Sequence, residues 1–368
     1  MKRIGILTLP LNNNYGGTLQ AFALYQFLKS NHHDVYLIQK EANRPKWKRL
    51  LIRILEKTPF QDIKKYRSSA IKNKFHRPFI DKHIPQRTKK SFTTSELESV
   101  SSDKNFDAVI VGSDQVWRLD YIDDGHCNNY FLDFVKSSKT LKVSYAASFG
   151  KDTWQDAGKY EEIKTLLQQF DAVSSREVSG VDICINYFNL DQCTHVLDPT
   201  LMVDKQIYNQ FLSPIAASQT KKLLIYILDH NAQKNSIASE LCNSLGESCQ
   251  PVFIYDDDSH TPKYDAAGWV NLFATSDFIV TDSFHGMVFS IIFNKQFVVI
   301  GNKDRGLARF SSLLNMLGLE SRLITSEDEY KTQEILNNPI DYTLVEPKLS
   351  DLKYRSQTFL TSSLLRSK

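Results

Sequence analysis

Four polar side chains interrupt an otherwise apolar stretch of the sequence: Thr281, Asp282, Ser283 and His285. The apolar residues 278–280 before it predict a buried strand, and residues 287–293 after it predict a helix. Open α/β sheets bind ligands at this point, where strands end and helices begin. An imidazole placed there can give or take a proton near neutral pH. The alternative interpretation is an Asp/Ser helix cap beside an incidental histidine.

Two further groups of residues follow predicted strands in the same way. Gly112-Ser113-Asp114 comes after the apolar residues 106–111, and Gly16-Gly17 comes after residues 3–9. A glycine turn at a helix N-terminus is a natural place for a phosphate or carboxylate. Ser/Asp capping and a plain tight turn are the alternative interpretations of these two groups.

Arginines supply the candidate cations of a site. Arg176 comes directly after the predicted strand 172–175, where a guanidinium can bind a carboxylate or phosphate in two-pronged fashion. A salt bridge to a neighbouring acid is the alternative. Arg305 and Arg309 follow the predicted strand 297–300 and are four residues apart, so on a helix they share a face.

The elements that would position these residues alternate as strand and helix in two series. The first series occupies residues 1–205 and the second residues 206–345, and a terminal helix within residues 346–368 can return to the first domain. This alternation predicts an α/β protein with two doubly wound domains.

Composition favours a cytoplasmic globular protein. The chain has 368 residues, is 42% hydrophobic, and contains no apolar run long enough for a membrane span. The chain starts with Lys2 and Arg3, and a short apolar run follows up to Pro10. We expect this start to form a strand and not a signal peptide. The five cysteines are irregularly spaced, so neither a disulfide framework nor a zinc site is predicted.

Charge is unevenly distributed along the chain. The net charge is +3, yet residues 44–90 carry sixteen Lys/Arg against three acids, which gives +13. Trp47, Leu50, Leu51 and Ile54 recur there at helical spacing, which predicts an amphipathic basic helix inserted in the first domain. A solvated face is the ordinary interpretation; contact with an anionic membrane or a phosphate-bearing acceptor is the functional one. Nucleic acid is not expected, because no binding motif accompanies the charge.

Metal and nucleotide cofactors are not predicted. The acids in the loop 120–130 do not have EF-hand spacing, so we assign no metal. The glycine turn after the first strand is not GxGxxG, and no acidic residue is placed to bind a dinucleotide ribose.

Four stretches in order resemble the polysaccharide pyruvyl transferase family over about residues 3–315. They are Asn14–Gln20, Gly112–Trp117, Ser174–Glu177 and Thr281–Gly286. The resemblance implies a GT-B-like fold, in which two Rossmann-like domains face each other across a cleft. It also implies transfer of pyruvate from phosphoenolpyruvate onto a sugar as a cyclic ketal.

The resemblance implies roles for two residues and a departure at a third. Arg176 matches the arginine that contacts the donor, and His285 matches the histidine of the family's Arg-x-His motif, taken as the catalytic acid. Ser283 stands where other members have arginine, which removes one donor-binding cation. Arg305 and Arg309 are the candidate replacements.

The remaining candidates support these roles. Asp114 or Asp282 could orient the histidine or act as the base. Gly16, Gly17, Ser113 and Ser283 are expected to help bind the donor.

The expected function is therefore pyruvyl transfer to a saccharide precursor of a capsular or exopolysaccharide, with phosphoenolpyruvate as co-substrate and no cofactor. The acceptor is expected to be carried on a lipid pyrophosphate, which would place the enzyme at the inner face of the membrane. A GT-B glycosyltransferase using a nucleotide sugar is the first alternative, with Asp256-Asp257-Asp258 available for the donor ribose. A non-catalytic carbohydrate-binding or scaffold protein is the second, and it would tolerate loss of His285.

Overall fold

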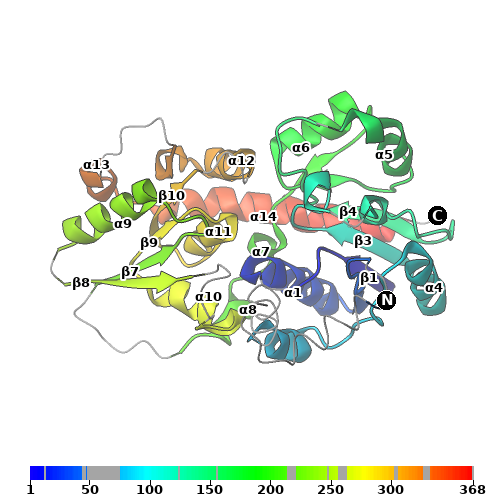
Figure 1. Ribbon diagram of the computed structural model, residues 1–368, viewed down its shortest axis with the longest axis horizontal. Coiled ribbons are helices and arrows are strands. Elements are labelled where there is room, and N and C mark those ends of the chain that lie inside the picture. The colour runs from blue at the N-terminus through cyan, green and yellow to red at the C-terminus, as the bar shows by residue number, and fades with distance from the viewer. Residues whose placement is uncertain are drawn as a thin grey trace.

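The computed structural model of the chain is shown in Figure 1. The ranges that it describes are 1–11, 14–43, 47, 75–122, 125–154, 156–213, 221–246, 248–255, 263–301, 306–325 and 332–366. Arg305, Asp256-Asp257-Asp258 and most of the basic segment 44–90 lie outside them. Within that segment, residues 75–83 are helical.

The first domain is built on a parallel four-stranded sheet of order β2-β1-β3-β4. The strands are β1 (Arg3–Leu7), β2 (Asp34–Leu37), β3 (Ala108–Gly112) and β4 (Leu141–Tyr145). Isolated bridges from β4 extend the sheet toward the short pair β5 (Ser174–Ser175) and β6 (Thr194–His195). The helices of this domain are α1 (Tyr15–Ser30), α4 (Thr94–Lys104), α5 (Tyr160–Leu167), α6 (Val178–Asp182) and α7 (Pro199–Met202).

The second domain is built on a parallel five-stranded sheet of order β11-β10-β9-β7-β8. Its strands are β7 (Lys221–Tyr226), β8 (Cys249–Ile254), β9 (Phe278–Thr281), β10 (Gln296–Ile300) and β11 (Leu323–Ile324). Its helices are α9 (Ala232–Ser244), α10 (Ala266–Thr275), α11 (Phe284–Ile292), α12 (Ala308–Leu317) and α13 (Thr332–Asn337), and the short α8 (Gln206–Asn209) precedes the domain.

The C-terminal helix α14 (Tyr342–Leu365) joins the two domains. It begins beside the second sheet, where the Tyr342 hydroxyl donates to the Lys295 carbonyl at 2.5 Å. It ends against the first domain, where Ser356 Oγ accepts from Leu197 N–H at 2.9 Å. Figure 1 shows this helix, in red, running past both sheets.

The domains also meet directly beside the glycine turn of the first strand. Tyr15 stacks on Trp269 of α10 with ring centroids 5.6 Å apart, and its hydroxyl donates to the Tyr264 carbonyl at 2.7 Å. Further along the interface, a β-carbon on Gly306 would lie only 2.5 Å from the Gly150 carbonyl oxygen. One continuous set of buried side chains therefore reaches from the first sheet to the second.

The predicted α/β class and the alternation of strands with helices are confirmed, and most strand positions agree within three residues. Two helices begin earlier than the apolar spacing predicts, since that spacing starts at Leu19 for the first and at Met287 for the second. Helix α1 starts at Tyr15, so Gly16 and Gly17 lie in its first turn, and α11 starts at Phe284, so His285 is helical. Helices α4 and α12 were not predicted. Among the described residues, no helix is long and apolar enough to cross a membrane.

Candidate active site

Residues from both domains converge where the carboxyl ends of the two sheets face each other. Ser113 and Asp114 follow β3, Arg176 follows β5, and Asp198 caps α7. From the second domain, α11 contributes Phe284 and His285 in its first turn, and α12 contributes Arg309. Each of these residues, taken with its backbone, is at least nine-tenths buried.

The Asp198 carboxylate is the centre of this cluster. Its Oδ2 accepts from Ser113 Oγ at 3.0 Å and from Arg176 Nη1 at 2.9 Å. The same oxygen lies 3.6 Å from His285 Nε2. Its Oδ1 accepts from the Thr200 backbone N–H and hydroxyl. One carboxylate thus positions a candidate donor-binding arginine and the candidate catalytic histidine.

These contacts determine the charge of Asp198. Burial alone would raise its pKa, because it disfavours the charged form. His285, Arg176 and the Thr200 hydroxyl oppose burial and together hold the pKa of Asp198 well below its ordinary value. Asp198 is therefore an anion across the working pH range, suited to orient neighbours and not to donate a proton.

His285 lies against the N-terminal turn of α1. A β-carbon built on Gly16 would be 2.0 Å from His285 Nδ1, so any larger residue would displace the ring. The other ring nitrogen, Nε2, lies 3.6 Å from Asp198 Oδ2, beyond hydrogen-bonding distance, and makes no hydrogen bond to the described residues. Buried polar atoms are normally satisfied, so Nε2 is available for a hydrogen bond to a ligand beside Asp198.

Two arginines flank the Phe284 ring. The guanidinium carbon of Arg176 lies 4.6 Å from the ring centroid and that of Arg309 lies 5.4 Å from it. Burial, followed by the positive charge of Arg176, lowers the pKa of Arg309 from 12.5 to about 10. Arg176 Nε and Nη2 are buried and make no hydrogen bond to the described residues. This pair of cations is therefore suited to receive an anionic ligand.

Two further carboxyl groups adjoin the arginines. Asp114 Oδ1 lies 3.6 Å from Arg176 Nη2, and the Asp114 backbone has a left-handed φ of 71°, a strained conformation for a non-glycine residue. Glu177 accepts from Phe149 N–H at 2.9 Å, and burial raises its pKa although Arg176 and Arg309 oppose the shift. Asp114 thus remains close enough to the cluster to act in it.

Asp282 does not join this cluster, contrary to the role expected for it beside His285. Its oxygens accept from Leu228 N–H at 2.6 Å, Asp229 N–H at 3.1 Å and Lys234 Nζ at 2.7 Å. Since its carboxylate is directed toward the loop between β7 and α9, it holds that loop in place. Asp282 and His285 are only three positions apart after β9, yet their side chains have different surroundings.

The glycine turn and Ser283 also differ from the sequence interpretation. Gly17 N–H already donates to Asn14 Oδ1, the N-cap of α1, at 3.0 Å, and Gly16 supports His285. Ser283 caps α11 by accepting from Gly286 N–H at 3.3 Å. We found no group of metal-ligating side chains among the described residues.

Sequence reasoning did not assign a role to Asp198, Glu177 or Phe284. Asp198 begins an Asp-Pro-Thr sequence that follows shortly after the strand β6. Its capping pattern resembles that of many helix starts, and only the fold brings Arg176 and His285 to it. The available signal was its position at a strand end, the same signal that identified Ser113.

The fold and the site at the domain interface define a GT-B protein. A UDP-N-acetylglucosamine 2-epimerase from Rickettsia bellii is similar, with a TM-score of 0.54, 9% identity, and coverage of 99% of this chain and 97% of that chain. The corresponding enzyme from Neisseria meningitidis, bound to UDP-GlcNAc, has a TM-score of 0.51 and 12% identity, covering 99% and 100%. Arabidopsis thaliana UGT89C1 with UDP-L-rhamnose has a TM-score of 0.50 and 8% identity, covering all of both chains.

Comparison of the sequence with family models identifies the family of this chain. The family model described as polysaccharide pyruvyl transferase matches residues 14–304, most of the chain. The protein belongs to the polysaccharide pyruvyl transferase family. No curated protein matches it in sequence.

Proposed function

We propose that this protein transfers pyruvate from phosphoenolpyruvate onto a saccharide acceptor. One observation carries the proposal: Arg176 and Arg309 flank Phe284, and the unsatisfied Nε2 of His285 lies in the same buried cluster. Phosphoenolpyruvate has a phosphate and a carboxylate, and it reacts when its methylene carbon is protonated. Two fixed cations and one imidazole match these three groups.

The reaction balances with protons from the acceptor. Protonation of the methylene carbon makes it a methyl group, and one saccharide hydroxyl adds to the neighbouring carbon. A second hydroxyl then displaces phosphate from that carbon and closes the ketal. The two saccharide hydroxyls release two protons. One of them restores the proton that the catalytic acid gave to the methylene carbon, and the other leaves with phosphate. His285 serves as the acid and Asp114 as the base in this scheme.

Arg309 takes the place of the arginine absent at position 283. Ser283 is uncharged, and its hydroxyl already caps α11 by accepting from the Gly286 N–H. Arg309 reaches the same Phe284 ring from α12, in the domain that carries His285. The donor-binding cation thus comes from α12 in place of position 283 beside α11, and it lies in the same cluster of side chains.

The test compares donors on the whole chain. We expect phosphoenolpyruvate to raise the melting temperature, and the R176A and R309M variants to lose that shift. With a saccharide acceptor, the H285A variant should lose turnover by about 10²–10⁴-fold, the contribution of a general acid. Thermal stabilisation by UDP- or GDP-sugars but not by phosphoenolpyruvate would contradict the proposal.

A nucleotide-sugar glycosyltransferase is the second candidate. The observation favouring it is that similar structures contain UDP, UDP-GlcNAc or UDP-L-rhamnose. The same thermal-shift panel distinguishes the two candidates, because the nucleotide sugar would bind in one case and phosphoenolpyruvate in the other.

We further propose that the acceptor is a lipid-linked precursor of a surface polysaccharide. The +13 charge of residues 44–90 supports contact with an anionic membrane, where each Lys or Arg adds about 1 kcal/mol. We expect salt-sensitive flotation with anionic vesicles, reduced when Lys46, Lys48, Arg49 and Arg53 are replaced by glutamine. No flotation in low salt would contradict membrane contact while leaving the donor chemistry unaffected.

A further inference from the structure

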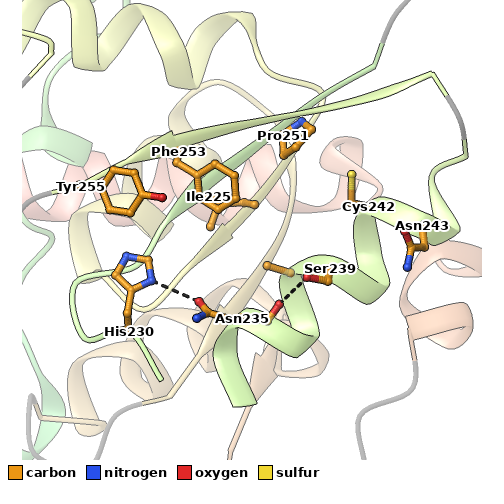
Figure 2. Close-up of a pocket in the computed structure, with 10 residues that line it drawn as sticks. Ile225, His230, Asn235, Ser239, Cys242, Asn243, Pro251, Phe253 and Tyr255 are labelled. Atoms are coloured by element: carbon orange, nitrogen blue, oxygen red, sulfur yellow. Dashed lines mark hydrogen bonds between the residues drawn. The ribbon is translucent and has the colours of Figure 1, made fainter. Parts of the chain in front are cut away.

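A groove lies on the second domain between α9 and the edge strand β8, apart from the arginine cluster (Figure 2). Its volume is about 640 Å³, within the usual range for small-molecule sites. The lining residues are Ile225, His230, Asn235, Ala238, Ser239, Cys242, Asn243, Pro251, Phe253 and Tyr255. None of the proposed transfer steps uses any of them.

One wall of the groove is aromatic. Phe253 lies in β8 and Tyr255 directly follows its last residue, so the alternation of side chains places both rings on the same face. Their rings are nearly parallel, at 9° with centroids 5.9 Å apart, and the His230 ring lies 5.4 Å from that of Tyr255. Phe253 is 39% exposed, which is unusual for so large an apolar ring.

The opposite wall is polar and has helical spacing. Asn235, Ser239 and Asn243 are four residues apart on α9, so they form one row along the helix. Asn235 Oδ1 lies 3.2 Å from His230 Nδ1 at the end of the groove nearest Tyr255. The Asn243 amide makes no hydrogen bond to the described part of the chain, and it lies beyond Cys242 at the end of the row opposite Asn235 (Figure 2).

The two walls have matching lengths. Four residue steps of extended chain, from Pro251 in β8 to Tyr255 just past its end, span about 13 Å. Eight steps along α9, from Asn235 to Asn243, span about 12 Å. The groove therefore suits an elongated ligand with one apolar face and hydroxyl groups along its edge.

The lining chemistry restricts the class of ligand. Among the residues that the structure describes, the ten that line the groove include no Lys, Arg, Asp or Glu, so these side chains do not favour a phosphate or an ammonium group. Pro251 lacks a backbone N–H, which disfavours pairing of a peptide strand with β8. A sugar ring has C–H bonds on its faces and hydroxyls at its rim, which match aromatic rings and amides respectively.

We infer that this groove binds a neutral oligosaccharide segment of about three sugar units, separately from the transfer site. The choice of a saccharide rests on the proposed function, since a polymeric acceptor offers sugar units beyond the one that reacts. His230 and Tyr255 lie at the carboxyl edge of the second sheet, the edge that also carries His285. A chain bound in the groove can thus extend toward the interface between the domains.

The test titrates the whole chain with maltotriose, cellotriose and the β-1,4-linked trimer of N-acetylglucosamine, followed by saturation-transfer NMR. We expect at least one trisaccharide to bind, and F253A and N243A each to weaken it by about fivefold, the size of a lost aromatic or polar contact. Both replaced residues are exposed, so the fold should persist. Y354A is the matched control, since Tyr354 is 70% exposed on α14 outside the groove.

Four results would overturn the inference. These are no binding of any trisaccharide, unchanged affinity in both groove variants, equal weakening by Y354A, and displacement of the trisaccharide by UMP. The thermal shift with phosphoenolpyruvate is measured on the same samples and should be unchanged in F253A. If a trisaccharide binds but phosphoenolpyruvate gives no thermal shift, the saccharide groove is supported and phosphoenolpyruvate as donor is contradicted. If phosphoenolpyruvate gives a shift but no trisaccharide binds, the donor is supported and the saccharide groove is contradicted.

Discussion

Gly16 and His285 lie in direct contact across the domain interface. A β-carbon on Gly16 would be 2.0 Å from Nδ1 of the imidazole and 2.4 Å from its Cγ. The glycine sits in the first turn of α1, and the histidine sits in the first turn of α11. The glycine therefore determines where the imidazole can lie, and a side chain there must move it.

The first prediction concerns this contact. G16A should reduce turnover by about 10²-fold or more, because the displaced imidazole no longer reaches the reacting carbon. Steady-state kinetics with phosphoenolpyruvate and a saccharide acceptor would measure the loss. We expect kcat to fall more than donor affinity, since Arg176 and Arg309 are left in place.

Gly17 provides a matched control in the same turn. The nearest atoms to a β-carbon there, in Asn14 and Asp114, are 3.4–3.5 Å away, which is ordinary van der Waals contact. G17A should keep turnover and gain about 0.5–1 kcal/mol of stability, the usual benefit of alanine over glycine in a helix. Equal turnover in G16A and G17A would show that the position of His285 does not matter.

Sequence patterns could predict the two parallel sheets and the strand ends that carry the site. They placed Ser113, Arg176 and His285 at carboxyl ends of strands, and the fold brings these three together. They could not reveal Asp198 as the common partner, because hydrogen bonds between segments far apart in the chain leave no local pattern. They also could not show that Asp282, so near His285 in sequence, directs its carboxylate toward Lys234.

Asp198 gives the second prediction. D198N should lower the free energy of unfolding by about 3–5 kcal/mol, because the buried Arg176 would lose its closer charged partner, at 2.9 Å, and keep only Asp114 at 3.6 Å. Urea denaturation at pH 7 measures this change. D103N is the control, since Asp103 is two-thirds exposed and its ion pair with Lys89 should contribute less than about 1 kcal/mol.

The lowered pKa of Asp198 also predicts how the stability of the protein depends on pH. The pKa of Asp198 is far below its ordinary value in the folded protein, so its stabilising contribution is complete above the unfolded pKa of about 4. As pH falls below 4 toward the folded pKa, that contribution is lost. Wild type should therefore lose stability more steeply than D198N between pH 5 and pH 2.5. Parallel curves would contradict an ionised Asp198.

The third prediction separates Asp282 from catalysis. Its ion pair with Lys234 is buried, with 2.7 Å between Nζ and Oδ2. D282N can keep only one of the two backbone hydrogen bonds, because an amide nitrogen cannot accept, and it leaves Lys234 without this charged partner, which together cost about 3 kcal/mol or more. At a temperature where the variant remains folded, turnover should stay above about a tenth of wild type, outside the range for loss of a general acid. A larger loss of turnover in folded D282N would restore a catalytic role for Asp282.

The last prediction concerns Arg309, where binding and stability should change in opposite directions. Its pKa is lowered from 12.5 to about 10 by burial and by Arg176, so the folded state holds this proton less tightly than the unfolded state. The resulting destabilisation is present below pH 10 and disappears as pH rises toward 12.5. Because a lowered pKa costs about 1.4 kcal/mol per unit and lost packing offsets part of the gain, R309M should raise the free energy of unfolding at pH 7 by about 1–3 kcal/mol.

The same variant should lose the thermal shift with phosphoenolpyruvate, because an anion bound between the arginines relieves their repulsion in the wild type. R355M is the control: Arg355 is 69% exposed and pairs with Asp351, so its replacement should leave both measurements unchanged. Urea denaturation and thermal shift on the three proteins give both readouts. An R309M variant that is less stable yet still stabilised by phosphoenolpyruvate would show that Arg309 packs the interface without holding the donor.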